Sequence, residues 1–340
     1  MLITIEEKIR ALDALGKLLK KLDDDTFDEL ACKVVNNNNW FTPAHTRMAL
    51  EGLSFFLEKK KLVSWLQSYS ISTPQSVRSV GLIMAGNVPA VGFHDLLCVL
   101  IAGHVAHIKL SATDGVLIPW LMEKLLSFEP RLERQVVWAE RLNGMEAYIA
   151  TGSDNSARYF DYYFGKYPHI IRKNRTSVAI LDGQESADDL ARLTDDIFLY
   201  FGLGCRNVSK IYLKDPIQLQ QVLQAADRQA KVIDHHKYLN NYEYNKSIYL
   251  VNQEPHLDNG FLLVRESKEL VSPIAVLFYE CYDSQEELLM QLAQNVNKIQ
   301  CTVSRQAWFP GSVPMGKAQF PTLGDYADHR DTLQFLLALK

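Results

Sequence analysis

A cysteine in a glycine-containing turn is the residue of this chain best suited to act as a nucleophile. Cys205 follows two glycines, Gly202 and Gly204. Glycines at this spacing allow a tight turn and let a second molecule approach the backbone closely. A thiolate attacks well when it is accessible and has a cationic neighbour, and Arg206 is adjacent. The alternative interpretation is a buried structural cysteine, because free cysteine is among the most buried residue types.

Two polar side chains stand where predicted strands end. The continuous apolar run Val80–Ala85 is typical of a strand buried on both faces, and Asn87 follows it. A second strand is predicted over His104–Leu110, with Lys109 at its end. The carboxyl ends of parallel strands share one edge of a sheet, where α/β proteins bind ligands. We therefore expect Asn87 and Lys109 to lie at a binding site.

A Gly-Ser turn follows another predicted strand, Ala147–Ile149. Thr151, Gly152 and Ser153 precede a helical stretch, and a helix N-terminus offers free backbone N–H groups to an anion, commonly phosphate. An ordinary N-cap by Ser153 explains the same residues. The sequence contains no G-x-G-x-x-G segment, so the usual dinucleotide fingerprint is absent and these residues alone leave the cofactor open.

The composition indicates a globular cytoplasmic protein. Of 340 residues, 47% are hydrophobic and 22% charged, enough for two cores, and the net charge of −4 gives no reason to expect nucleic acid. The five cysteines include no C-x-x-C pair, as expected of reduced thiols. Charges come too early at the N-terminus for a signal peptide, and polar residues interrupt the longest apolar region, so we expect no membrane span.

The histidine pairs do not predict a metal site. His235 and His236 are adjacent and point in different directions, so they cannot share one metal ion. His104 and His107 lie in a strand-like run, where their odd spacing puts them on opposite faces.

The elements that must position these side chains alternate between strands and helices. This order predicts an α/β fold with parallel, doubly wound sheets. Amphipathic helices are expected before it, over residues 4–22, from about Asp25, and from Pro43 with Thr42 as its cap; we interpret them as a layer over a sheet edge. Later strands are predicted over Ser177–Asp182, Val208–Leu213, Phe261–Val264, Ile274–Tyr279 and Thr302–Ser304, and later helices over residues 186–201, 216–231, 284–295 and 331–339.

From Val80 to about Pro314 the order of motifs resembles the aldehyde dehydrogenase superfamily, and within it the acyl-CoA reductases of the LuxC type. Ala85–Pro89 resembles the superfamily's Pro-Trp-Asn-x-Pro segment and keeps its Asn and second Pro. Ile108–Ser111 resembles the Lys-Pro-Ser segment that holds the adenosine ribose. Thr151–Ser153 resembles the Gly-Ser turn beside the dinucleotide, although Ala157 replaces its second glycine.

The resemblance continues in the second half of the chain. Gly204-Cys205 occupies the nucleophile position, and Glu269–Pro273 resembles Glu-x-Phe-Gly-Pro, whose Glu binds the nicotinamide ribose. The implied fold is aldehyde-dehydrogenase-like, with two doubly wound parallel-sheet domains and a helical N-terminal layer. We expect residues 1–176 to form the helices and the dinucleotide-binding domain, 177–310 the catalytic domain, and 311–340 a tail that packs back on the body.

The implied activity is NAD(P)H-dependent reduction of a fatty acyl thioester, such as an acyl-CoA, to the aldehyde through an acyl-cysteine. The catalytic residues would be Cys205 and Asn87. The cofactor would be held by a set of polar and glycine residues, namely Lys109, Ser111, Thr151, Gly152, Ser153 and Glu269.

Two departures from the superfamily bear on the reaction. Arg172–Thr176 stands in place of Glu-Leu-Gly-Gly-Lys and lacks the Glu that activates hydrolytic water, which favours acyl-CoA reduction over aldehyde oxidation. Ala112 stands where NAD-preferring relatives often have a Glu, so NADPH is expected, with NADH possible. The alternatives are an NAD(P)-dependent aldehyde dehydrogenase and a non-catalytic dinucleotide-binding protein on the same fold. The chain is short for the superfamily, so the oligomerisation arm is expected to be reduced, and a homo-oligomer remains open.

Overall fold

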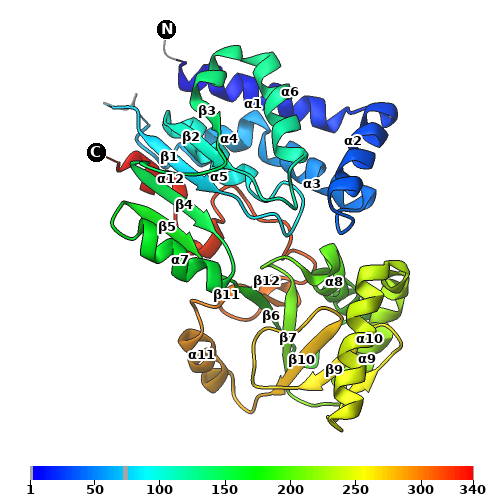
Figure 1. Cartoon of the computed structure of the whole chain (residues 1–340). Coiled ribbons are helices and arrows are strands. Elements are labelled where there is room, and N and C mark those ends of the chain that lie inside the picture. Colours follow the sequence, from blue (N-terminus) through cyan, green and yellow to red (C-terminus); the bar gives the residue numbers. More distant parts are fainter. Residues whose placement is uncertain (1–2, 72–75, 340) are drawn as a thin grey trace. The chain divides into compact units, whose positions relative to one another are not determined.

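The computed structural model describes residues 3–71 and 76–339 (Figure 1). The chain forms two compact units. One consists of Met1–Asn174 together with Thr322–Lys340, and the other of Arg175–Pro321. The second unit is therefore inserted into the sequence of the first.

The first unit begins with four helices, α1 (Ile5–Lys20), α2 (Asp24–Asn37), α3 (Pro43–Phe56) and α4 (Lys59–Leu66). Thr4 forms the predicted capping box with Glu7, and Thr42 caps α3, which Pro43 opens. The apolar stripes of these helices join the core of the first sheet, where Leu15 and Leu57 are fully buried. The three predicted helices are confirmed, and α4 was not expected.

The first sheet contains five parallel strands in the order β3-β2-β1-β4-β5. They are β1 (Ser79–Ile83), β2 (Val105–Lys109), β3 (Val136–Trp138), β4 (Ala147–Thr151) and β5 (His169–Arg172), and the accompanying helices are α5 (Phe93–Ala102), α6 (Leu117–Phe128), the 3-10 helix η1 (Pro130–Gln135) and α7 (Asp154–Phe164). The strand order reverses between β1 and β4. In open α/β sheets this reversal leaves a crevice at the carboxyl ends of the two strands, where ligands bind.

The C-terminal segment completes the core of the first unit. It contains the 3-10 helix η5 (Ala327–His329) and α12 (Thr332–Leu337), drawn in red in Figure 1. Leu333 and Leu336 are fully buried. The buried Arg172 forms an ion pair with Asp95, and its Nη2 also donates to Thr332 Oγ1 over 2.8 Å.

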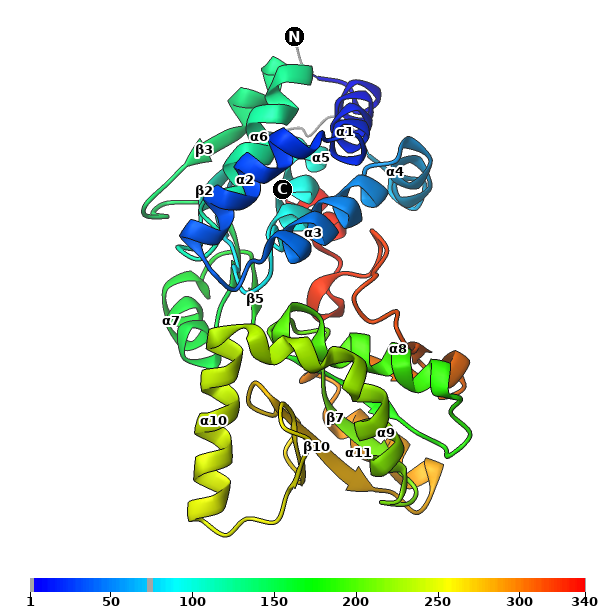
Figure 2. The same ribbon diagram turned by 90° about the vertical axis from the view of Figure 1, so that its right-hand side faces the viewer.

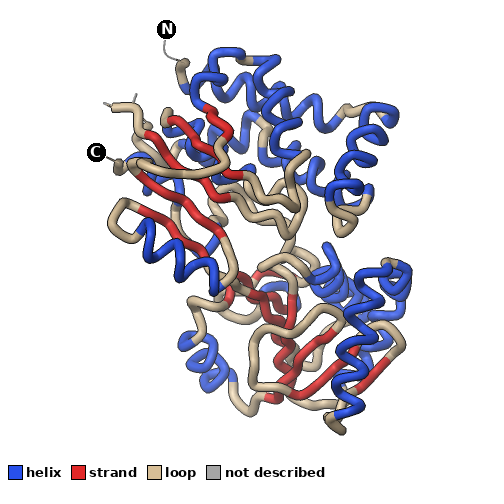
Figure 3. The backbone as a smooth tube through the Cα atoms, in the orientation of Figure 1, coloured by secondary structure: helices blue, strands red, loops and turns tan. Residues whose placement is uncertain are grey.

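The second unit is built on a seven-stranded sheet in the order β12-β11-β6-β7-β10-β9-β8. Figure 3 draws the strands in red. All its neighbouring strands run parallel except β8 and β9. Its elements are β6 (Thr176–Ile180), α8 (Ala187–Phe198), η2 (Leu199–Gly202), β7 (Val208–Leu213), α9 (Gln218–Ala226), η3 (Asp227–Asp234), α10 (His236–Val251), β8 (Leu257–Asp258), β9 (Leu263–Glu266), β10 (Val276–Cys281), α11 (Gln285–Gln294), β11 (Ile299–Ser304), η4 (Arg305–Ala307) and β12 (Val313–Pro314).

These two parallel-sheet units confirm the predicted fold class. The long helix α10, prominent in Figure 2, was not predicted, because its aromatic and polar residues alternate around the helix and give no apolar stripe. The strand β5 was also missed, since its four residues follow a loop and end in Arg172. The helix expected over 216–231 ends at Ala226 and continues as a 3-10 helix.

Candidate active site

The turn that carries Asn87 follows β1 and is held by the segment that follows β2. Thr113 Oγ1 donates to the Gly86 carbonyl over 2.7 Å. Asp114 Oδ2 accepts from the Ala90 backbone N–H over 2.8 Å, and Ala90 has a left-handed φ of 58°. Such a conformation is uncommon for a residue with a side chain and needs support from its surroundings. The Asp114 carboxylate supplies that support, while Asn87 itself is exposed.

Burial is the main influence on Asp114. Its side chain is almost completely removed from solvent, and this burial raises the pKa of Asp114 to about 6. The hydrogen bonds that it accepts from backbone N–H groups lower its pKa, because they stabilise the charged form.

Lys109 and Ser111 lie at the same sheet edge as Asn87. Lys109 is the last residue of β2, pairs in register with Ile83 of β1, and is exposed. Ser111 Oγ lies 2.7 Å from Thr113 Oγ1, the hydroxyl that binds the Gly86 carbonyl. The sheet thus brings together three predicted site residues from two neighbouring strand ends.

The Gly-Ser turn lies at the carboxyl end of β4, the other strand at the reversal of strand order. Thr151 ends β4, and the Gly152 N–H donates to the Arg172 carbonyl of β5 over 3.3 Å. Ser153 caps α7, its Oγ accepting from the Ser156 N–H over 3.2 Å, so the N-cap is confirmed. Anion binding at this turn stays a prediction.

Gly152 has no room for a side chain. A Cβ there would lie 2.8 Å from Ser156 Cβ and 2.9 Å from a ring carbon of Phe160. The close packing of α7 against the turn therefore requires glycine at this position. The N-terminus of α7, which follows directly, is the kind of backbone site at which phosphates bind.

Cys205 belongs to the second unit and lies in a turn between η2 and β7. Its side chain is half-buried, whereas Cys98 and Cys301 are buried. The Cys205 carbonyl accepts from Ser177 Oγ of β6 over 3.0 Å. This placement disfavours the interpretation of Cys205 as a buried structural thiol.

The backbone before Cys205 is strained. Tyr200 and Phe201 have left-handed φ values of 52° and 57°, and Gly202 follows with 77°. Non-glycine residues in this conformation cost about 1–3 kcal/mol each and are common at functional sites. The sequence shows the glycines of this segment, but nothing in it indicates that the two aromatic residues adopt a left-handed conformation. Asn207, whose side chain holds this turn, was not predicted as a functional residue either.

Glu269 lies in the loop between β9 and β10 of the second unit. Its side chain is exposed, and its backbone N–H donates to Ser267 Oγ over 3.1 Å. The next residue ties the loop to the strand that follows Cys205, because the Leu270 carbonyl accepts from Ser209 Oγ over 2.7 Å. Asn87 and the other predicted cofactor residues belong to the first unit.

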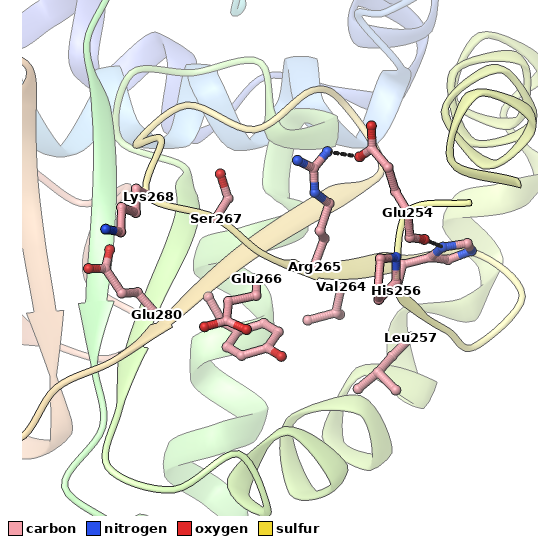
Figure 4. A pocket seen from close by; sticks show the side chains of 11 residues that line it. Glu254, His256, Leu257, Val264, Arg265, Glu266, Ser267, Lys268 and Glu280 are labelled. Atoms are coloured by element: carbon pink, nitrogen blue, oxygen red, sulfur yellow. Dashed lines mark hydrogen bonds and ion pairs between the residues drawn. The ribbon is translucent and has the colours of Figure 1, made fainter. Parts of the chain in front are cut away.

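A pocket of about 620 Å³ lies at the carboxyl end of β9 (Figure 4). Its lining residues include positively and negatively charged side chains. Arg265 pairs with Glu254, and Glu280 pairs with the buried Lys210. Burial lowers the pKa of Lys210. The residues that line it include neither Cys205 nor Glu269. We therefore do not assign this pocket to the reaction.

The segment Arg172–Thr176 is occupied by structural contacts. The buried Arg172 pairs with the half-buried Asp95, Lys173 Nζ lies 3.7 Å from Asp161 Oδ2, and Arg175 Nη1 donates to the Ile299 carbonyl over 3.2 Å. Arg172 therefore acts within the core of the first unit.

Within residues 3–71 and 76–339, no group of three or more His, Cys, Asp or Glu side chains is arranged to hold a metal ion. The same part of the chain contains no helix that is both long and apolar enough to cross a membrane.

The fold resembles solved aldehyde dehydrogenase structures. Aldehyde dehydrogenase 21 from Physcomitrella patens, in complex with succinate, is 13% identical, with a TM-score of 0.71 over 98% of this chain and 84% of that chain. The glyceraldehyde-3-phosphate dehydrogenase GapN from Methanocaldococcus jannaschii, complexed with NADP, is 13% identical, with a TM-score of 0.67 over 94% and 83%. An aldehyde dehydrogenase from Mycobacterium tuberculosis, complexed with NAD+, is 14% identical, with a TM-score of 0.60 over 88% and 73%. Identities this low show the fold alone.

No curated protein matches the sequence. A family model does: the one described as acyl-CoA reductase (LuxC) matches residues 10–262. That span is most of the chain and includes Asn87, the Gly-Ser turn and Cys205. The chain therefore belongs to the acyl-CoA reductase (LuxC) family.

Proposed function

We propose that this protein reduces a fatty acyl-CoA to the aldehyde with NADPH, through an acyl intermediate on Cys205. The observation that carries the proposal is the half-buried Cys205, held on a strained turn in a chain of the acyl-CoA reductase family. A nucleophile needs such a defined and accessible position.

The sheet edge of the first unit supports the proposal of a nicotinamide dinucleotide site. The strand order of that sheet reverses between β1 and β4, and the turn that contains Gly152 stands at that edge, directly before the N-terminus of α7. We propose that Lys109 and Ser111 hold the adenosine ribose, that Thr151, Gly152 and Ser153 bind beside the phosphates, and that Glu269 binds the nicotinamide ribose. When bound, the reduced nicotinamide supplies the hydride.

The role of Cys205 follows from thiolate chemistry. Its sulfur adds to the thioester carbonyl, and collapse of the tetrahedral species expels CoA as a thiolate and leaves the acyl group on Cys205. After the carbonyl carbon has received hydride, the bond to the Cys205 sulfur breaks, the aldehyde leaves and the thiolate is restored. Asn87 would donate its amide N–H to the oxyanion, a contribution worth about 10²–10³ in rate for one donor.

The preference for NADPH over NADH is proposed from Ala112. An acidic residue at this position would repel the 2′-phosphate, whereas Ala112 carries no charge and the exposed Lys109 is near it in sequence. The value of kcat/KM should be at least as high with NADPH as with NADH. A clear preference for NADH would contradict the proposal.

The function is tested by following the absorbance of NADPH with acyl-CoAs of graded chain length. The wild type should consume NADPH and release CoA and aldehyde, fastest with fatty acyl chains. Cys205→Ala should abolish turnover and leave NADPH binding nearly unchanged. Cys32→Ala and Cys281→Ala, at two exposed thiols, are matched controls and should retain activity. Normal turnover by Cys205→Ala would refute the mechanism, and oxidation of aldehydes without activity on acyl-CoA would favour an aldehyde dehydrogenase.

A further inference from the structure

We infer that Asn207 is the positioning residue of the nucleophile, fixing Cys205 in the geometry that attack requires. This inference rests on the proposed role of Cys205. It starts from the observation that one buried amide binds both the end of the helix before the turn and the first residue of the turn that contains this cysteine. The Asn207 side chain is almost completely inaccessible to solvent.

The amide nitrogen of Asn207 binds the end of the helix before the turn. Its Nδ2 lies 2.7 Å from the Leu199 carbonyl, 3.1 Å from that of Asp196 and 3.3 Å from that of Ile197. The last carbonyls of a helix have no partners within the helix. Asn207 supplies one from across the turn and so fixes where the helical chain stops.

The amide oxygen and the backbone of Asn207 close the turn itself. Oδ1 accepts from the Gly204 N–H over 2.8 Å, and the Asn207 N–H donates to the Gly204 carbonyl over 3.0 Å. Gly204–Asn207 is thus a four-residue turn fastened twice at its ends. Cys205 and Arg206 are its two central residues, so their direction depends on those two hydrogen bonds.

These contacts bracket the strained segment. Tyr200 and Phe201 follow Leu199 immediately, and such strain persists only where neighbouring structure fixes it. Phe201 also packs against His235, with ring centroids 4.3 Å apart. Without the Asn207 amide, the two aromatic residues would lose the hydrogen bonds on either side of them, which would let the segment relax toward ordinary backbone angles and rotate the turn.

A second connection runs through Asp196. Its buried carboxylate accepts from the backbone N–H groups of Gly316 and Ala318 over 2.6 and 3.1 Å. The Ala318 carbonyl in turn accepts from Arg206 Nη1 over 3.3 Å. The second central residue of the turn is therefore tied to the same end of α8 that Asn207 binds.

Only an amide of this length provides both halves of the arrangement. A carboxylate in place of Asn207 could accept from Gly204 but could not donate, and it would face three carbonyl oxygens. Asn207→Asp keeps the side-chain volume but leaves at most one O–H donor, on the protonated acid, in place of two N–H donors. Asn207→Ala removes both interactions.

The test compares these variants with Gln218→Ala. The buried Gln218 holds the turn at the other end of β7, its Oε1 accepting from the Lys214 and Asp215 N–H groups over 3.0 and 3.1 Å. Rapid mixing with acyl-CoA, followed by intact mass, measures acylation of Cys205 in a single turnover. Asn207→Asp should slow acylation about 10²-fold, the effect of displacing a reacting group by about 1 Å, with KM changed less than about twofold. Gln218→Ala should lower the unfolding temperature without slowing acylation.

Equal slowing in Asn207→Asp and Gln218→Ala, or unchanged acylation in Asn207→Asp, would overturn the inference. Asn207→Asp remains a test of the same hydrogen bonds if Asn207→Ala does not fold. Failure of the proposed function has a different signature, namely an unacylated Cys205 in the wild type and normal turnover by Cys205→Ala. In that case the rate at which iodoacetamide alkylates Cys205 tests the inference. If this rate in Asn207→Asp is within about threefold of the rates in the wild type and in Gln218→Ala, the positioning role of Asn207 is refuted.

Discussion

Replacing Gly86 by alanine should disturb the Asn87 turn through a single methyl group. The space for that methyl is already filled: a Cβ on Gly86 would lie 2.5 Å from Thr113 Oγ1 and 2.6 Å from Ser111 Cβ. Carbon atoms in contact are normally about 3.5–4.0 Å apart. Gly86 does not have a left-handed φ, so crowding rather than backbone angle is the cause of the expected effect.

The magnitude follows from what each neighbour can do. The Thr113 hydroxyl can rotate away, but it then loses its 2.7 Å hydrogen bond to the Gly86 carbonyl, which costs about 1 kcal/mol. Ser111 Cβ cannot rotate away because it is fixed to the backbone, so the segment after β2 must move. Overpacking of this kind costs about 1–3 kcal/mol. Together, the lost hydrogen bond and the overpacking should lower the free energy of unfolding of the first unit by about 2–4 kcal/mol.

The same displacement should reduce activity. The Asn87 turn and Ser111 would be pushed apart, and a shift of about 1 Å in a positioned group can cost about 10² in rate. Turnover of NADPH with a saturating acyl-CoA and the unfolding temperature of the intact protein are the two measurements.

Gly52→Ala is the matched control. Gly52 lies within α3 and has no atom within 4 Å of the position of a Cβ. Alanine should stabilise that helix by about 0.5–1 kcal/mol and leave turnover unchanged. If Gly86→Ala unfolds at the wild-type temperature and keeps full activity, the reasoning about this turn is refuted.

Three further predictions address the ion pair, a buried carboxyl group and the intermediate. Asp95→Ala leaves the buried Arg172 guanidinium without its carboxylate and should lower the free energy of unfolding, measured with urea, by about 3–5 kcal/mol. Asp188→Ala breaks an exposed pair with Arg192 and should lower it by less than about 1 kcal/mol. Equal effects of the two substitutions would contradict this prediction. Burial raises the pKa of Asp196 from 3.8 to about 7, so its contribution to stability is complete below pH 3.8 and is lost as the pH rises through about 7. The unfolding temperature of the wild type relative to that of Asp196→Asn should therefore fall as the pH rises between these two values. A difference that stays constant would contradict this prediction. Acyl-CoA without NADPH should leave one long-lived acyl group on Cys205, which intact mass will detect. A general base that activates water speeds hydrolysis by about 10²–10⁴-fold, and the segment that replaces Glu-Leu-Gly-Gly-Lys has no carboxylate to act as one. Rapid release of free acid would contradict this prediction.

The strongest sequence predictions concerned elements whose cause is local. The capping box of Thr4 and Glu7, the Thr42-Pro43 helix start and the apolar run that forms β1 all appear in the structure, because each is specified within a few residues. The positions of Asn87 and Lys109 followed from the same logic, since both mark strand ends.

Elements that depend on distant partners were harder to predict. The short β5 owes its place to pairing with β4, and its Arg172 to a carboxylate 77 residues away. Asn207 gives no sign in the sequence of binding three carbonyls, because those contacts exist only after α8 and β7 have formed. The strain at Tyr200 and Phe201 is likewise imposed by tertiary contacts, against the ordinary preference of aromatic residues.

The insertion of one unit into the other has a consequence for synthesis on the ribosome. Domains generally fold as units when their sequence is complete, and Arg175–Pro321 is complete before Thr322–Lys340 has been made. The synthesis of the first unit therefore begins before that of the second unit but is completed only after it. Until then the nascent first unit lacks Leu333 and Leu336, and the apolar surface they cover stays open to chaperones.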